Sequence, residues 1–326
     1  MKKILLTGTD LAVSPLSLGT VNYGSKTGEK EAFGQMDKYL ASGGNFIDTA
    51  SIYGCFEGSV EKHASEKVIG RWLKDRHARN EIVISTKGGH PFAYDPDFTI
   101  RLHRDELFED VEKSLTHLNT DYIDMYFLHR DDPGMPVSEI LETLEEIRKQ
   151  GKIRYYGFSN WRIDRAAQAQ AYAKAHGIKG FSLNQLMWSL AHVDAGEITD
   201  KTLVAMDRET YAYHTKTQIG AMAYRSIAKG YFTRREKGIE MRSDLVSAYS
   251  ANLNDEIFSL LTHLKSETGC SMAELSLMYF LSQPFPSVAI ASFSNDEQLK
   301  EGLCVLTKNY DKEILALLKN ARHDLF

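Results

Sequence analysis

The sequence predicts an α/β protein, a single (β/α)8 or TIM barrel over residues 1–326. Short runs rich in β-branched and aromatic residues alternate with helical patterns along nearly the whole chain. Several of these runs are continuously apolar, which is typical of parallel strands that are covered on both faces. A doubly wound sheet is the main rival, but no Gly-x-Gly-x-x-Gly turn follows the first run, as it would in a dinucleotide-binding sheet.

The expected strands begin after a short N-terminal hairpin. Ile4–Leu6 and Val13 flank Thr9-Asp10, and we expect this hairpin to close the bottom of the barrel. The barrel strands follow at Leu16–Gly19, Asn45–Asp48, Ile82–Thr86, Tyr122–Leu128, Ile153–Ser159, Phe181–Gln185, Gln218–Tyr224 and Ser287–Ala291.

Helices are expected between these strands because apolar residues recur there at helical spacing. Ser271 with Glu274, and Ser294 with Glu297, have the spacing of capping boxes that start helices. The apolar faces are Phe33, Met36 and Leu40; Leu107, Val111, Leu115 and Leu118; and Ile140, Leu144 and Ile147.

Two connections are long for a barrel, Gly88–Arg104 and Ala191–Gln218. Long loops in compact domains are often functional. Loops that follow strands lie at the C-terminal face of a barrel, where active sites form, so we expect both connections there.

Composition and charge exclude several classes of protein. Hydrophobic residues make up 43% and charged residues 25%, and the net charge of −5 gives no reason to expect nucleic acid or an anionic membrane as partner. The three cysteines form no Cys-x-x-Cys pair and indicate a reducing compartment. The N-terminal apolar run is too short for a signal peptide, and no stretch reaches the roughly 20 apolar residues of a membrane helix. We therefore expect a cytoplasmic protein, and the oligomeric state stays open.

Four polar residues lie at or just after expected strand ends: Asp48, Tyr53, Lys87 and His129. All four should point into one cup above the barrel. A nearby ammonium favours a phenolate and lowers the pKa of a tyrosine, and a carboxylate would hold the lysine in place. A neutral imidazole can hydrogen-bond a substrate oxygen, so the set suits proton delivery to an oxygen that gains negative charge.

Each of these residues also has a simpler interpretation. An aspartate at a strand end is often a helix N-cap, a tyrosine before glycine is often only packed, and a lone histidine is often structural. Lys87 could also form a Schiff base, as in barrel aldolases.

The arrangement resembles the aldo-keto reductase family, in its bacterial and channel-associated branch. The likeness covers about residues 3–305 in the right order. It rests on Ser14–Thr20, Asp48-Thr49-Ala50-x-x-Tyr53-Gly54, Thr86-Lys87, Leu128-His129, Gly151–Asn160, Leu183-Asn184-Gln185, Ala223-Tyr224 and Glu297-Gln298-Leu299.

The resemblance implies an NADP(H)-dependent reductase of aldehyde or ketone carbonyls, with NAD(H) as the other cofactor choice and no metal. It makes Tyr53 the general acid, tuned by Lys87 and Asp48, while His129 orients the carbonyl. Ser159, Asn160 and Gln185 would bind the carboxamide and Tyr224 would stack on the nicotinamide. The expected cofactor contacts are Thr20, Asp48, Ser159, Asn160, Gln185, Tyr224, Arg225, Ser226, Lys229, Ser292, Ser294 and Gln298.

A binding site for a phosphate of the cofactor is also indicated without the resemblance. It is expected at the helix N-terminus after the eighth strand, because this position in a barrel favours anions. The chain departs from the family's pattern in three segments that would contact the cofactor. Ile290-Ala291-Ser292 replaces Ile-Pro-Gly, Gly302 replaces an asparagine near the adenine, and Arg225-Ser226-Ile227 replaces Ser-Pro-Leu. Asp296 and Glu297 would repel a nearby 2′-phosphate, which Arg225 or Lys229 could offset.

By their positions at strand ends and loops, the expected walls of the substrate pocket are Tyr23, His90, Phe92, Trp161 and Trp188. Aromatic residues beside polar groups suit sugar-like or small aromatic carbonyl compounds, and they equally suit many other aldehydes. Two other functions stay open from the sequence. One is a cofactor-binding regulatory or redox-sensing module with weak turnover. The other is a lyase or aldolase that uses Lys87.

Overall fold

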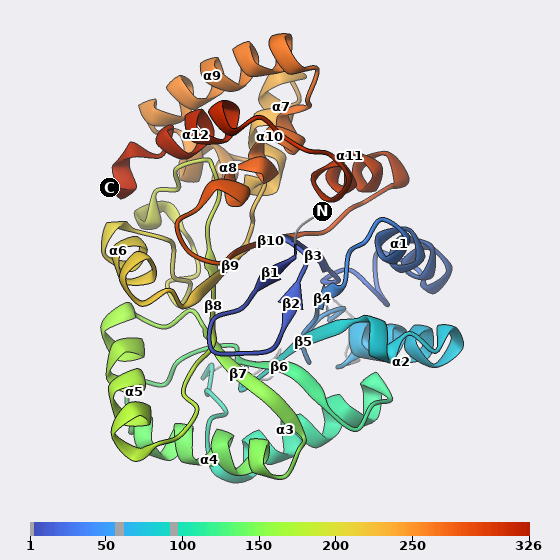
Figure 1. Ribbon diagram of the computed structural model, residues 1–326, viewed down its shortest axis with the longest axis vertical. Coiled ribbons are helices and arrows are strands. Elements are labelled where there is room, and N and C mark those ends of the chain that lie inside the picture. The colour runs from blue at the N-terminus through green and yellow to red at the C-terminus, as the bar shows by residue number, and fades with distance from the viewer. Residues whose placement is uncertain (1–2, 56–61, 92–96) are drawn as a thin grey trace.

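The computed structural model describes residues 3–55, 62–91 and 97–326, and within them eight parallel strands close into a barrel (Figure 1). Neighbouring strands follow the order β10-β3-β4-β5-β6-β7-β8-β9, so the predicted fold is confirmed. The strands are β3 (Leu16–Gly19), β4 (Phe46–Asp48), β5 (Val83–Gly88), β6 (Ile123–Leu128), β7 (Ile153–Ser159), β8 (Leu183–Met187), β9 (Gly220–Tyr224) and β10 (Ser287–Ala291).

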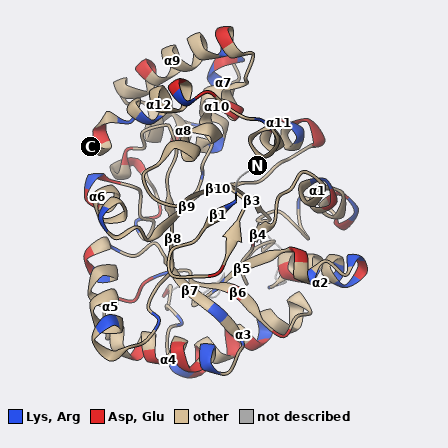
Figure 2. Ribbon diagram, viewed as in Figure 1, with Lys and Arg blue, Asp and Glu red and all other residues tan. Residues whose placement is uncertain are grey.

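Helices surround the barrel (Figure 1). Met36, Leu107, Val111, Ile140 and Leu144 of the predicted faces are fully buried. Charged residues of both signs are spread over the outer helices, while the strands carry few (Figure 2). The helices of this ring are α1 (Glu29–Ala41), α2 (Ala64–Arg76), α3 (Arg104–Leu118), α4 (Val137–Lys149), α5 (Ile163–His176), α6 (Arg208–Thr217), α10 (Met272–Met278) and α11 (Asp296–Thr307). No helix in the described part of the chain is long and apolar enough to cross a membrane.

The longest connection runs from β9 to β10, and of its helices the sequence analysis predicted only the last, α10, from the Ser271 cap. It contains α7 (Tyr231–Glu236), α8 (Ser243–Tyr249), α9 (Asn252–Thr268) and α10, which gather with α12 (Lys312–Asn320) on one side of the barrel (Figure 1). Ala191–Gln218, predicted as a long loop, instead contains the barrel helix α6. Gln218 ends that helix in the left-handed region (φ 60°), which is why β9 begins two residues later than predicted.

The N-terminal hairpin seals the bottom of the barrel. β1 (Ile4–Leu5) pairs with β2 (Ala12–Val13) in antiparallel fashion, as predicted. Leu6 and Val13 are fully buried and pack against interior strand residues that include Phe46 and Phe127. In Figure 1 the hairpin lies across the centre of the ring of strands. The open end of the barrel is therefore the C-terminal face.

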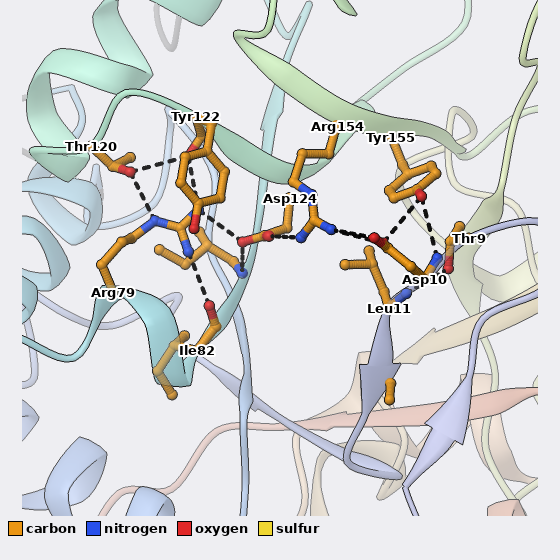
Figure 3. A network of polar contacts seen from close by, with 12 residues as sticks. Thr9, Asp10, Leu11, Arg79, Ile82, Thr120, Tyr122, Asp124, Arg154 and Tyr155 are labelled. Atoms are coloured by element: carbon orange, nitrogen blue, oxygen red, sulfur yellow. Dashed lines mark hydrogen bonds and ion pairs between the residues drawn. The ribbon is translucent and has the colours of Figure 1, made fainter.

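A network of polar contacts joins the hairpin to the barrel strands (Figure 3). Asp124 of β6 is nearly buried and accepts from Arg79 Nη2 at 2.9 Å and from Arg154 Nη1 at 2.7 Å. Its Oδ2 also accepts from the Ile84 N–H at 3.0 Å. Arg154 continues to Asp10 in the hairpin at 2.7 and 2.8 Å. Asp124 is thus the centre of the network.

Replacing Asp124 by alanine should lower the free energy of unfolding by about 2–3 kcal/mol, because it removes the buried carboxylate that accepts from Arg79, Arg154 and the Ile84 N–H. Urea denaturation followed by circular dichroism measures this change. Asp164→Ala is the matched control, since its partner Arg162 is exposed, and it should stay within about 0.5 kcal/mol of wild type. Equal losses in the two variants would contradict this account of the network.

The two predicted capping boxes have different outcomes. Ser271 caps α10, accepting from the Glu274 N–H at 3.1 Å, although the Glu274 carboxylate binds Lys308 and Tyr310 instead of completing a box. The box predicted from Ser294 and Glu297 is wrong by one residue. Asn295 caps α11 by accepting from the Gln298 N–H at 2.9 Å, and the Gln298 side chain accepts from the Ser294 N–H at 3.0 Å.

His214 is a fully buried histidine of α6 that the fold holds in the neutral form. Its Nδ1 lies 2.7 Å from the Ile219 carbonyl oxygen, and its Nε2 lies 3.0 Å from Asn184 Nδ2. Burial lowers the pKa of His214 to about 4, although the contact with Ile219 acts in the opposite direction. Since an unfolded histidine titrates near pH 6.5, the unfolded chain binds more protons between these values.

The stability that comes from neutral His214 should therefore be present above about pH 6.5 and be lost as the pH falls towards 4, by about 2 kcal/mol at pH 5. Urea midpoints of wild type and His214→Asn, measured from pH 7 to pH 5, test this. The variant should show a shallower decline, whereas replacing the exposed His263 by asparagine should leave the decline as in wild type. Parallel declines in wild type and His214→Asn would contradict the assignment.

Candidate active site

A buried ion pair lies at the C-terminal end of the barrel. Asp48 ends β4 and Lys87 lies in β5, which extends one residue beyond it. The Lys87 ammonium donates to the two Asp48 oxygens at 2.9 and 2.7 Å and to the Thr49 carbonyl at 2.7 Å. Ser85 Oγ and Gln185 Nε2 also donate to Asp48 Oδ1, at 2.8 and 2.9 Å. Burial lowers the pKa of Lys87, but Asp48 and Tyr53 outweigh it, so the net shift is upward and the lysine is charged.

Tyr53 lies in the turn after β4, with its ring over the lysine. Lys87 Nζ is 4.6 Å from the centroid of the phenol ring. Burial raises the pKa of Tyr53, and the charges of Lys87 and Arg130 lower it without cancelling that effect. The sequence prediction is therefore right about the sign of the lysine's contribution and wrong about the net direction. A raised pKa keeps Tyr53 protonated at neutral pH, as a proton donor must be.

His129 directly follows β6 and completes the group. Its ring meets that of Tyr53 edge to face, with centroids 6.0 Å apart. Burial, with contributions from His90, Lys87 and Arg130, holds the pKa of His129 well below its ordinary value. The imidazole is therefore neutral. Its buried Nδ1 has no hydrogen-bond partner among the described residues.

A cavity of about 970 Å³ opens above these side chains. Asp48, Tyr53 and His129 line it, whereas Lys87 is fully buried behind them. All the predicted cofactor contacts are among its lining residues: Thr20, Asp48, Ser159, Asn160, Gln185, Tyr224, Arg225, Ser226, Lys229, Ser292, Ser294 and Gln298. The structure thus brings the predicted catalytic and cofactor residues together around one space.

Comparison with known proteins identifies the family. The sequence model that describes the aldo/keto reductase family matches residues 15–322, which is most of the chain. The chain belongs to the aldo/keto reductase family. It is accordingly an oxidoreductase enzyme of a family that acts on small-molecule carbonyl compounds, generally with NAD(P)H.

Three relatives illustrate the range of the match. Over 98% of its length the chain is 31% identical to an uncharacterized oxidoreductase of Bacillus subtilis, YrpG, of which 95% is covered. Over 59% of its length it is 32% identical to a norsolorinic acid reductase of Aspergillus flavus, of which 51% is covered. Over 98% of its length the chain is 26% identical to a putative aryl-alcohol dehydrogenase of Saccharomyces cerevisiae, and the match covers 85% of that protein.

In this aldo/keto reductase, Asn160 already makes hydrogen bonds within the protein. Its Nδ2 donates to the His129 carbonyl at 3.2 Å and to Ser159 Oγ at 3.0 Å. Its Oδ1 accepts from the Val204 N–H at 3.2 Å and from the Tyr224 hydroxyl at 2.6 Å. An amide has two donor protons and two acceptor positions, so a carboxamide bound here would have to replace one of these bonds.

Several cavity hydroxyls also serve the barrel itself. Thr20 Oγ1 donates to the Asp48 carbonyl at 2.8 Å, Ser226 Oγ to Ile290 at 2.6 Å and Ser292 Oγ to Gly19 at 2.9 Å. Their donor protons tie adjacent strand ends together. Thr20 Oγ1 already accepts from Ser65 Oγ at 2.8 Å, whereas the oxygens of Ser226 and Ser292 can still accept a hydrogen bond from a ligand.

The predicted substrate wall needs correction. Tyr23, Trp161 and Trp188 are core residues, each no more than 2% exposed, and none is among the described residues that line the cavity. Tyr23 donates to Gln35, and Trp188 donates to Tyr279 within an aromatic cluster. His90 stays next to the site, with its ring centroid 4.8 Å from that of His129. Phe92 lies outside the described residues.

The sequence prediction missed cationic residues of the cavity wall, namely Arg130, Arg234 and Lys237. Arg130 donates to Thr202 Oγ1 at 2.9 Å and to the His129 carbonyl at 2.9 Å. Its position directly after His129 was a usable signal, because it belongs to the same strand end. Arg234 and Lys237 had no such signal, since they belong to the unpredicted helical segment after β9.

The ring of Phe293 explains why glycine, and not the asparagine of the family's pattern, occupies position 302. A Cβ atom at this position would lie 2.5 Å from the Phe293 ring. The ring of Phe293 therefore fills the space that a larger side chain at position 302 would need. Phe293 and Gly302 both line the cavity, so the ring shapes its wall there.

Proposed function

We propose that this chain reduces aldehyde or ketone carbonyls to alcohols with NADPH, and that Tyr53 is the general acid. The observation that carries the proposal is the buried Asp48–Lys87 pair, whose ammonium lies 4.6 Å from the Tyr53 ring at the base of the cavity. A protonated phenol held beside a fixed positive charge can give its proton to an oxygen, and the charge stabilises the phenolate that results.

Each residue has a defined part in this reaction. The Tyr53 hydroxyl donates a hydrogen bond to the carbonyl oxygen and transfers its proton as that oxygen gains charge. Neutral His129 donates a second hydrogen bond and orients the carbonyl. Asp48 keeps Lys87 charged and in place. A bound nicotinamide cofactor supplies the hydride, which no side chain can provide.

The residues present fit such a cofactor. Polar groups of Ser159, Asn160 and Gln185 lie at the catalytic end of the cavity, where a carboxamide would bind. Tyr224 lines the same end and can stack on a ring. The volume of about 970 Å³ lies at the upper end of the range of ligand sites.

The charges of the wall favour NADP(H) over NAD(H). Lys229, Arg234 and Lys237 line the cavity and can bind a 2′-phosphate. Glu301 opposes them from α11. Asp296, which the sequence suggested would repel a phosphate, forms an ion pair with Lys38 at 2.6 Å and is not among the residues that line the cavity.

We propose an aromatic carbonyl compound as the substrate class. Two relatives are named for norsolorinic acid and for aryl alcohols, which supports aromatic over sugar-like compounds. In this chain the rings of Tyr53, His129 and His90 lie together at the base of the site. A Schiff-base lyase has no comparable support, because the Lys87 ammonium is buried and donates to three oxygens.

Fluorescence titration with NADPH and NADH, followed by turnover of an aldehyde panel, tests the proposal. We expect NADPH to bind at least about tenfold more tightly than NADH and aryl aldehydes to be reduced. Equal or tighter NADH binding would overturn the cofactor choice alone. Binding without turnover of any aldehyde would overturn the reductase and favour a regulatory or redox-sensing module.

A further inference from the structure

The first turn of α2 holds a buried carboxylate that the proposed reaction does not use. Glu66 is fully buried, and one of its oxygens contacts a strand while the other contacts the N-cap residue of its own helix. Thr86 Oγ1 of β5 donates to Glu66 Oε1 at 2.5 Å, and His63 Nδ1 lies 2.5 Å from Glu66 Oε2. A buried carboxylate is costly unless such partners compensate it, so these contacts fix Glu66 in one position.

One of these contacts leads to the strand that carries Lys87. Thr86 directly precedes Lys87, and side chains alternate along a strand. Thr86 therefore points outward to Glu66, whereas Lys87 points inward to Asp48. A shift of Thr86 relative to α2 would move the adjacent Lys87 as well.

The other contact leads to the turn that carries Tyr53. His63 adopts a left-handed backbone conformation (φ 64°), and its N–H donates to the Ser51 carbonyl at 2.7 Å. Two residues later, the N–H of Ser65 donates to the Tyr53 carbonyl at 3.2 Å. The same turn of helix thus holds the main chain of Tyr53 on one side and the strand of Lys87 on the other.

We propose that Glu66, with His63 and Thr86, is a positioning group that sets the placement of Tyr53 against Lys87. The inference rests on the proposed role of Tyr53. His63, Glu66 and Thr86 are not among the described residues that line the cavity, so they act through the residues they hold. Misplacement of reacting groups by about 1 Å can cost on the order of 10²-fold in rate, which makes such a device consequential.

Thr86→Val removes the hydroxyl and keeps the shape, while Thr86→Ser keeps the hydroxyl and serves as the matched control. In Thr86→Val we expect kcat for an aryl aldehyde to fall about tenfold or more, with KM and the Kd for NADPH within about twofold of wild type. Thr86→Ser should keep kcat within about twofold of wild type. Wild-type kcat in Thr86→Val would overturn the inference.

A double-mutant cycle separates positioning from a general structural effect. If the network acts through Tyr53, adding Thr86→Val to Tyr53→Phe should cause no further loss of the residual rate. Multiplying losses would overturn the inference. If Thr86→Val does not fold, Glu66→Gln takes its place in the cycle, with the same two outcomes. A wild-type enzyme that turns over no aldehyde overturns the proposed function itself and this inference with it, which distinguishes the two failures.

Discussion

Replacing Tyr53 by phenylalanine should lower kcat for aldehyde reduction by about 10²–10⁴-fold, the usual contribution of a general acid. The substitution removes the proton donor and keeps the ring, so the ring still covers the Lys87 ammonium. The Kd for NADPH should therefore change little. Steady-state kinetics with an aryl aldehyde, together with fluorescence titration of the cofactor, measure the two quantities separately.

Tyr23→Phe is the matched control for this variant. Tyr23 is buried near the same strand ends, but its hydroxyl donates to Gln35 and it is not among the residues that line the cavity. Its loss should leave kcat unchanged. A Tyr53→Phe enzyme with nearly normal turnover would show that the proton comes from another group.

The barrel could be predicted because short apolar runs and helical periodicity directly reflect which residues are buried. Most strands were placed to within two residues, and the hairpin was found from the apolar residues on both sides of Thr9-Asp10. The helices α7 to α9 after β9 were missed, although Ile257, Leu261 and Leu264 of α9 recur at helical spacing and are buried. These helices pack on one side of the barrel and interrupt the alternation of strand and helix on which the prediction relied.

The cup of polar residues was predictable for a different reason. Parallel strands in a barrel end at one face, so polar residues at several strand ends must converge. The direction in which a side chain points beyond a strand end is less constrained, because the main chain turns there. Trp161 and Trp188 follow β7 and β8 closely, yet both turn into the core, where Trp161 donates to the Arg130 carbonyl and Trp188 to Tyr279.

The direction of the Tyr53 pKa could not be predicted from residue types alone. The sequence names Lys87 as a neighbour, and the lysine does lower this pKa. Burial opposes it and is larger, and burial depends on how closely the turn after β4 packs onto the barrel. Electrostatic tuning is thus a property of the packed site, which links it to the contacts of Glu66 with Thr86 and His63.

Replacing Lys87 by methionine should have two separable effects. Without the ammonium the pKa of Tyr53 rises further, so kcat falls and, for alcohol oxidation, the rise of rate with pH moves to higher pH. The Asp48 carboxylate also loses the partner that contacts both its oxygens, and leaving a buried charge unpaired costs about 3–5 kcal/mol of stability. Kinetics across pH and urea denaturation measure these effects independently.

The double variant Asp48→Asn/Lys87→Met distinguishes tuning from folding. A neutral amide can still accept from Ser85 Oγ, which donates to Asp48 in the wild type, so most of the lost stability should return. The pH profile should return only in part, because Asp48 no longer raises the pKa of Tyr53 but the larger effect of the Lys87 charge is still missing. The rate should stay low for the same reason. Recovery of both rate and pH profile in the double variant would mean that Lys87 serves only to neutralise Asp48. A profile that stays in place in Lys87→Met would show that the lysine does not tune Tyr53, whatever its effect on stability.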